Sequence, residues 1–104
     1  MSTRHDLRRQ DRQACDHNVT VLWQDAGGQN KFVIAKALDI CECGLRLQMP
    51  EPMPTQRYLT LRAPKLGLLG HASVKHCSRS AGSKFVVGVE FTAGLRWTPQ
   101  DEVE

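Results

Sequence analysis

The sequence lacks a long apolar run and an apolar leader. No stretch of the 104-residue chain approaches the roughly 20 apolar residues that would span a bilayer, so we expect no membrane insertion. The first residues, MSTRHDLRRQDRQ, are polar and charged and lack the apolar core of a secretory signal. We therefore expect a cytoplasmic protein whose thiols stay reduced.

A large excess of one charge is also lacking. The net charge of +3 is too small to indicate nucleic acid binding by itself, so no DNA or RNA partner is expected. The four cysteines include no pair spaced as CxxC, the usual spacing in structural zinc sites. A chain of this length can bury a core as one domain without a metal or disulfide, which become usual below about 40 residues.

What the sequence does contain is alternation of apolar and polar residues, which predicts β-strands. The expected strands cover residues 19–23, 32–40, 45–49, 58–62, 72–77 and 85–91. Glycine, proline, serine and aspartate cluster between them, and no interior segment has a convincing helical period. We predict an all-β fold, a six-stranded antiparallel barrel, because closure removes the exposed edges of such a sheet.

The ends of the chain are expected to differ from the barrel. Residues 1–6 are predicted to be a flexible tail, and residues 7–96 the barrel domain with the arginine-rich segment that precedes its first strand. Residues 97–104 are predicted to be a tail or a short helix, because Thr98 and Pro99 are typical of a helix start.

Three arginines stand close together in the segment RRQDR: Arg8, Arg9 and Arg12. On a helical turn or in a compact loop, Arg8 and Arg12 would point the same way because they are four residues apart. Each guanidinium offers paired donors that fit phosphate oxygens or a guanine edge. The alternative interpretation is a solvated basic tail.

The segment DICECG suggests a metal site at first. Cys41 and Cys43 are two residues apart and would face the same side of a strand, with His76 and Cys77 completing a zinc site. The pattern is weak, because His76 and Cys77 are adjacent and would point to opposite faces of a strand.

A simpler interpretation treats these cysteines as structural. Cys43 is in phase with Leu45 and Leu47, so it is predicted to be a small buried apolar residue. Cys15 and Cys77 are predicted to be free thiols without an evident role.

Two motifs, in order, resemble those of the PilZ domain family. RRQDR is similar to the family's RxxxR, and DICECG to its [D/N]xSxxG; KFVVGVEF is similar to its last strand. The resemblance covers residues 7–91. It implies a six-stranded barrel that binds cyclic di-GMP, a bacterial second messenger with two guanines and two phosphates, and that needs no further cofactor.

The resemblance also implies roles for individual residues. Arg8 and Arg12 would grip phosphate and guanine edges, and Arg9 would add charge or stack. Asp39 would accept hydrogen bonds from the N1/N2 edge of a guanine, and Gly44 would allow a backbone shape denied to residues with a Cβ.

Cys41 departs from the family pattern, which has serine at this position. A thiol donates and accepts hydrogen bonds more weakly than a hydroxyl. One neutral hydrogen bond contributes about 0.5–1.5 kcal/mol, so its loss lowers affinity by up to about tenfold. We expect Cys41→Ser to keep or improve the affinity for cyclic di-GMP in a calorimetric titration, and weaker binding by this variant would contradict the comparison with serine.

Together these features predict a cyclic di-GMP signalling receptor or adaptor rather than an enzyme. Ligand would order the segment before the barrel, and an unidentified protein partner in motility, biofilm or polysaccharide pathways would respond. The alternatives are a PilZ-like adaptor that no longer binds nucleotide, and a small zinc- or nucleic-acid-binding barrel. The choice between one bound ligand and a stacked pair stays open, and Leu7 before the motif adds no charge.

Overall fold

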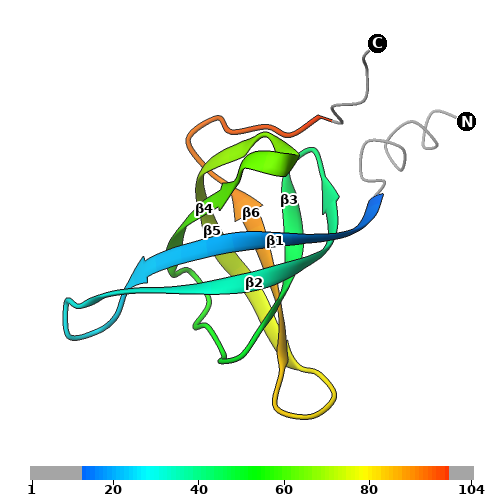
Figure 1. Cartoon of the computed structure of the whole chain (residues 1–104). Coiled ribbons are helices and arrows are strands. Elements are labelled where there is room, and N and C mark those ends of the chain that lie inside the picture. The colour runs from blue at the N-terminus through cyan, green and yellow to red at the C-terminus, as the bar shows by residue number, and fades with distance from the viewer. Residues whose placement is uncertain (1–12, 99–104) are drawn as a thin grey trace, which may run out of the picture.

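The computed structural model describes residues 13–98, which form a closed antiparallel barrel of six strands (Figure 1). The strands are β1 (Gln13–Gln24), β2 (Asn30–Cys41), β3 (Gly44–Met49), β4 (Tyr58–Ala63), β5 (Leu68–Arg79) and β6 (Phe85–Phe91). Their order around the barrel is β1-β2-β3-β6-β5-β4, and pairing of β1 with β4 closes it. The predicted all-β barrel is confirmed.

The alternation in the sequence decides which side chains face the interior. Every second residue is buried at 19–23, 45–49, 59–63 and 87–91, whereas the start of β1, the start of β2 and the end of β5 stay largely exposed; the buried side chains together form one core. The largest fully buried side chains are Ile40, Leu45, Leu47, Met49, Leu59, Leu61, Leu68, Val19, Val21, Val74 and Val87. All six strands contribute to this core, so the outer face is left for polar groups and ligands.

Two strands begin earlier than the sequence pattern indicates. β1 begins at Gln13, although residues 13–18 are mostly polar, because this segment pairs with the last part of the long β2. β5 begins at Leu68, directly after a 3-10 helix at Pro64–Leu66 that the sequence analysis did not predict. In both cases cross-strand pairing overrides weak local alternation.

Three irregularities interrupt the strand pairing. They lie between Ala14 and His17 in β1, between Ala37 and Asp39 in β2, and between Val74 and His76 in β5. Such irregularities bend a strand and re-aim side chains. Two of them adjoin Asp39 and His76, which belong to the candidate site described below.

The segment after β6 packs back onto the barrel. Trp97 is buried, its indole nitrogen donates to the carbonyl of Leu66 at 2.9 Å, and its backbone nitrogen donates to the carbonyl of Glu42 at 3.0 Å. Trp97 therefore belongs to the barrel core. The predicted tail at 1–6 and the positions 99–104 of the predicted C-terminal tail or helix lie outside the described residues.

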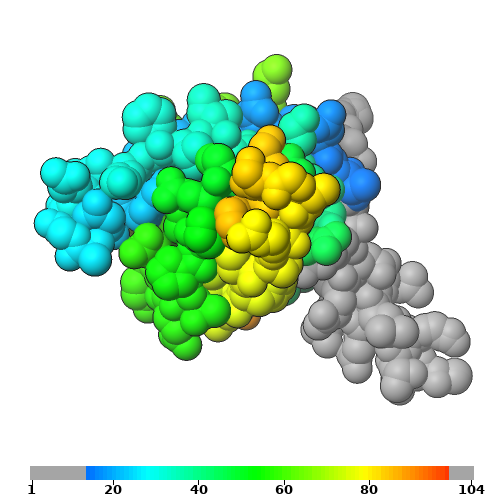
Figure 2. Space-filling view, turned by 90° about the horizontal axis from the view of Figure 1, so that it is seen from below, coloured from blue at the N-terminus to red at the C-terminus, as the bar shows by residue number. Residues whose placement is uncertain are grey.

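The β1–β2 hairpin projects beyond the barrel, and the space-filling view shows the same projection at one side (Figure 2). Phe32 and Ile34 in β2, Tyr58 in β4 and Leu69 in β5 are large apolar side chains that stay exposed. In the part of the chain that the structure describes, no helix is long and apolar enough to cross a membrane.

Candidate functional site

Asp39 and Arg46 form an ion pair on the outer face of the β2–β3 hairpin. The two residues are cross-strand partners, and both Nε and Nη2 of Arg46 donate to Oδ2 of Asp39, the first at 2.8 Å. Arg46 lies between the buried Leu45 and Leu47, so its side chain faces outward. The pair therefore places a carboxylate on the outer surface of the barrel wall.

The ion pair orients the carboxylate of Asp39 and affects the guanidinium of Arg46. Hydrogen bonding and attraction from Asp39 raise the pKa of the Arg46 guanidinium above its ordinary value. Asp39 is a buried acidic residue, whereas the side chain of Arg46 is 44% exposed. Arg46 thus holds a largely covered carboxylate in place while staying partly solvated, so the pair does not bury two charges completely.

The β2–β3 turn consists of Glu42 and Cys43, because Cys41 pairs directly with Gly44. The predicted burial of Cys43 is wrong: Cys43 is exposed, since β3 begins only at Gly44 and the turn breaks the phase set by the later leucines. Cys41 is the buried thiol, 5% exposed, and it lies on the same outer face as Asp39. Asp39 and Cys41 therefore share one face of the strand, as the ligand hypothesis requires.

Gly44 is required by close backbone packing. Its φ is not positive, so the backbone shape expected from the sequence is not the reason for glycine here. A Cβ at this position would lie far inside van der Waals contact with the carbonyl oxygen of Val89 in β6. Glycine therefore allows β3 to approach β6 directly at the turn.

We expect Gly44→Ala to lower the free energy of unfolding by about 3 kcal/mol, because the added methyl meets backbone that cannot rotate away. Gly88→Ala is the matched control. There the added methyl meets the exposed ring of His76, which can change rotamer, so we expect a change within about 1 kcal/mol. Urea unfolding of both variants measures the difference, and equal losses would contradict the backbone explanation.

An open hollow of about 260 Å³ adjoins this turn, and we call it the thiol hollow. It is lined by Cys41, Cys43, Gly44, Lys75, His76, Gly88, Val89 and Glu90. The ring of His76 lies over Gly88, which is the cross-strand partner of both Arg46 and His76. A band of polar groups thus runs over the outer face from Asp39 through Arg46 to His76.

The sequence analysis missed Arg46 and considered His76 only as a zinc ligand. A signal for Arg46 was present, because counting outward from a two-residue turn places Arg46 opposite Asp39. The position of His76 depends on the irregularity in β5 and on the absence of a side chain at Gly88, which strand alternation does not reveal.

The register of β1 and β2 places the start of β1 beside Asp39. Arg8, Arg9 and Arg12 lie outside the described residues. However, Gln13 and Ala14, with which the described chain begins, pair with Ile40 and Asp39. The first described residues, which follow Arg12 directly in sequence, therefore lie beside Ile40 and Asp39 of β2.

Partial desolvation affects the thiols of Cys15 and Cys43. It raises the pKa of Cys15 and of Cys43 above their ordinary values, and the neighbouring Cys41 thiol adds to the effect at Cys43. Both thiols are therefore protonated at neutral pH. All four cysteines are free, including Cys77.

The part of the chain that the structure describes offers no set of ligands for the zinc site considered from the sequence. Among residues 13–98, no three histidine, cysteine, aspartate or glutamate side chains are grouped closely enough to hold a metal ion. Cys41 and Cys43 do lie together, but His76 and Cys77 do not complete a metal site with them.

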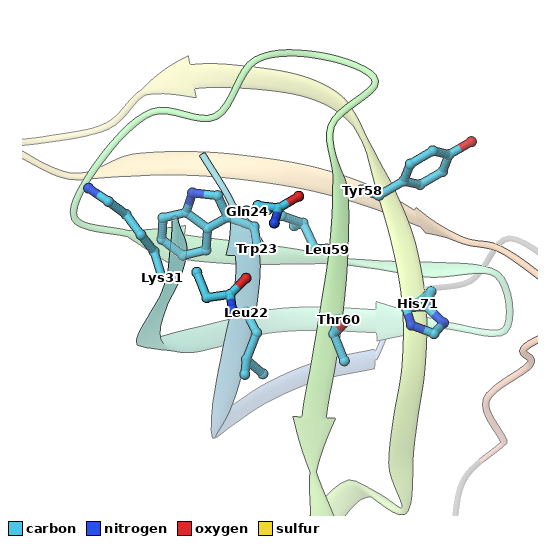
Figure 3. A pocket seen from close by; sticks show the side chains of 9 residues that line it. Leu22, Trp23, Gln24, Lys31, Tyr58, Leu59, Thr60 and His71 are labelled. Carbon is cyan, nitrogen blue, oxygen red and sulfur yellow. The ribbon is translucent and has the colours of Figure 1, made fainter. Parts of the chain in front are cut away.

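Two larger hollows lie elsewhere on the outer face. One, of about 410 Å³, lies where β1 and the start of β2 meet β4 and β5, with Tyr58, Thr60 and His71 on its rim (Figure 3). The other, of about 460 Å³, lies over β1, β2 and the end of β4 and includes Arg62 and Lys65. The predicted site residues Asp39, Cys41 and Gly44 line neither hollow.

The chain matches no protein-family model, and a search of curated proteins finds no match.

Proposed function

We propose that this chain is a cyclic di-GMP-binding signalling module of the PilZ type. The observation that carries the proposal is the register of β1 against β2, in which Ala14 pairs with Asp39 directly after the RRQDR motif. On this register, a ligand bound near Asp39 would lie close to the point where the chain continues from the RRQDR motif into β1. The two motifs that the resemblance rests on are far apart in sequence, and the strand that follows the first motif pairs with the strand that carries Asp39.

The carboxylate of Asp39 suits a guanine edge. The N1–H and N2–H groups of guanine are donors, and an ionised carboxylate is an acceptor only. Arg46 orients this carboxylate through Oδ2. Such preorganisation supports selective recognition of guanine over adenine, which presents no matching pair of donors.

The arginine motif supplies the complementary charge. Cyclic di-GMP carries two phosphates, and guanidinium groups bind phosphate through paired, charge-assisted hydrogen bonds. Arg8, Arg9 and Arg12 precede β1 directly, so a ligand held by them would contact the face that bears Asp39. Ordering of residues 4–13 by ligand would be the change that a partner protein detects.

A protein-interaction adaptor without nucleotide binding is the second candidate. The observation that favours it is the exposure of four large apolar side chains: Phe32 (68%), Ile34 (59%), Tyr58 (71%) and Leu69 (68%). These side chains lie on β2, β4 and β5, and exposed apolar groups suit a protein partner. This surface is also compatible with a receptor that signals through a partner.

Calorimetric titration of the fully reduced chain with cyclic di-GMP tests the proposal. We expect binding at micromolar concentration or tighter, with the heat also giving the number of ligands bound. Cyclic di-AMP is the matched control ligand, because it keeps both phosphates and lacks the guanine donor edge. Equal binding of the two ligands would contradict guanine recognition, and no heat with either would favour the adaptor.

A further inference from the structure

Cys41 and Cys43 form a pair of thiols at the β2–β3 turn. Their sulfurs are 3.8 Å apart, within the distance of a weak sulfur hydrogen bond. Cys41 is buried and Cys43 is exposed, and both line the thiol hollow, which is open to solvent. A small reagent can therefore reach the exposed sulfur of Cys43, and the buried sulfur of Cys41 lies next to it.

We propose that Cys41 and Cys43 are a modification site, at which exchange with a low-molecular-weight disulfide forms a reversible intramolecular disulfide. Bonded sulfurs lie about 2.05 Å apart, so the two sulfurs must approach by roughly 1.8 Å, a shift within reach of side-chain rotation. Two backbone hydrogen bonds hold the β2–β3 turn in place while the sulfurs approach each other. The Cys43 carbonyl accepts from the nitrogen of Phe91 at 2.8 Å, and the Glu42 carbonyl accepts from that of Trp97 at 3.0 Å.

The reaction proceeds in two exchange steps. The Cys43 thiolate attacks one sulfur of the reagent RSSR, which forms a Cys43–SR mixed disulfide and releases RS⁻. The Cys41 thiolate then attacks the Cys43 sulfur, which closes the internal disulfide and releases the second RS⁻. The two cysteines lose their protons, the two RS⁻ take up protons, and two electrons pass from the cysteine sulfurs to the reagent.

The position of the pair makes the bond reversible. The closed loop contains one intervening residue, Glu42, so the disulfide removes little entropy from the unfolded chain. Cys43 is exposed, so an external thiol can attack the bond and return the pair to the reduced state. The other two thiols differ: Cys15 donates to the carbonyl of Ala37, and Cys77 lies in β5.

Oxidation would also change the proposed ligand turn, a consequence that rests on the proposed function. The disulfide removes the only hydrogen-bond donor on the Cys41 side chain and draws its sulfur toward Cys43. We expect the oxidised chain to bind cyclic di-GMP several-fold more weakly than the reduced chain. Equal affinities would overturn this coupling.

The experiment uses the reduced full chain and oxidised glutathione in a mildly alkaline buffer, because partial desolvation raises the pKa of Cys43. Tryptic cleavage after Lys36 and Arg46 leaves both cysteines in one peptide, residues 37–46. We expect this peptide to lose two hydrogens without keeping glutathione, and dithiothreitol to restore them. A peptide that keeps both thiols, or that retains a glutathione adduct, would overturn the proposal.

Two variants make the assignment specific. Cys43→Ser removes an exposed thiol, so the chain is expected to fold, and its 37–46 peptide should show no loss of two hydrogens. Cys15→Ser/Cys77→Ser keeps the turn pair and should be oxidised as the wild type is. The mass measurement involves no nucleotide, so failure of cyclic di-GMP binding would reject the proposed function and its coupling but not the disulfide.

Discussion

An Arg8→Ala/Arg12→Ala variant is expected to lose at least about a hundredfold in affinity for cyclic di-GMP. Hydrogen bonds to charged groups contribute about 1.5–3 kcal/mol each, so removal of two guanidinium contacts costs roughly 3–6 kcal/mol of binding free energy. Calorimetric titration measures the loss. Both substituted residues precede β1, so no residue of the described barrel is changed.

The matched control removes the same charge from a distant place. Arg79→Ala/Lys84→Ala changes two exposed cations at the β5–β6 hairpin. Gly44 pairs with Glu90 whereas Met49 pairs with Phe85, so this hairpin lies at the other end of β6 from the β2–β3 turn. We expect the control to bind within about twofold of wild type. An equal loss in both variants would mean that net charge, rather than the RRQDR motif, attracts the ligand.

The alternation of apolar and polar residues was sufficient to predict that this barrel has six strands, but not where each strand begins. Val19, Val21, Leu45 and Leu47 stand at every second position, and all four are fully buried. The predicted sixth strand at 85–91 matches β6. The sequence pattern failed where pairing compensates for weak alternation, at the first residues of β1 and at Leu68.

The candidate site was predictable only in part. The face shared by Asp39 and Cys41 follows from their spacing on a strand. The exposure of Cys43 did not follow, because alternation cannot show where a turn interrupts the strand. The need for glycine at position 44 did not follow either, since it depends on β6, which lies far along the chain. Local pattern determines the face of a residue, and long-range pairing determines its neighbours.

Asp39→Asn is expected to lower the affinity for cyclic di-GMP by about ten- to a hundredfold. The amide keeps one oxygen acceptor but presents an NH₂ donor where the carboxylate offers a second acceptor. That donor would face the N1–H or N2–H group of guanine, and the charge assistance is lost, at a cost of about 1.5–3 kcal/mol. Asp16→Asn is the matched control, because Asp16 is an exposed acid that pairs with Lys36 at 3.0 Å.

The same variants separate the structural role of Asp39 from its role in ligand binding. We expect Asp39→Asn to lower the free energy of unfolding by about 1–2 kcal/mol, since Arg46 loses a charged partner but can be solvated. Asp16→Asn should cost less than about 0.5 kcal/mol, as is usual for exposed ion pairs. Arg46→Gln completes a double-mutant cycle with Asp39→Asn. If Arg46 orients the carboxylate, Arg46→Gln weakens ligand binding only while Asp39 is present; additive losses would show that the two residues act independently.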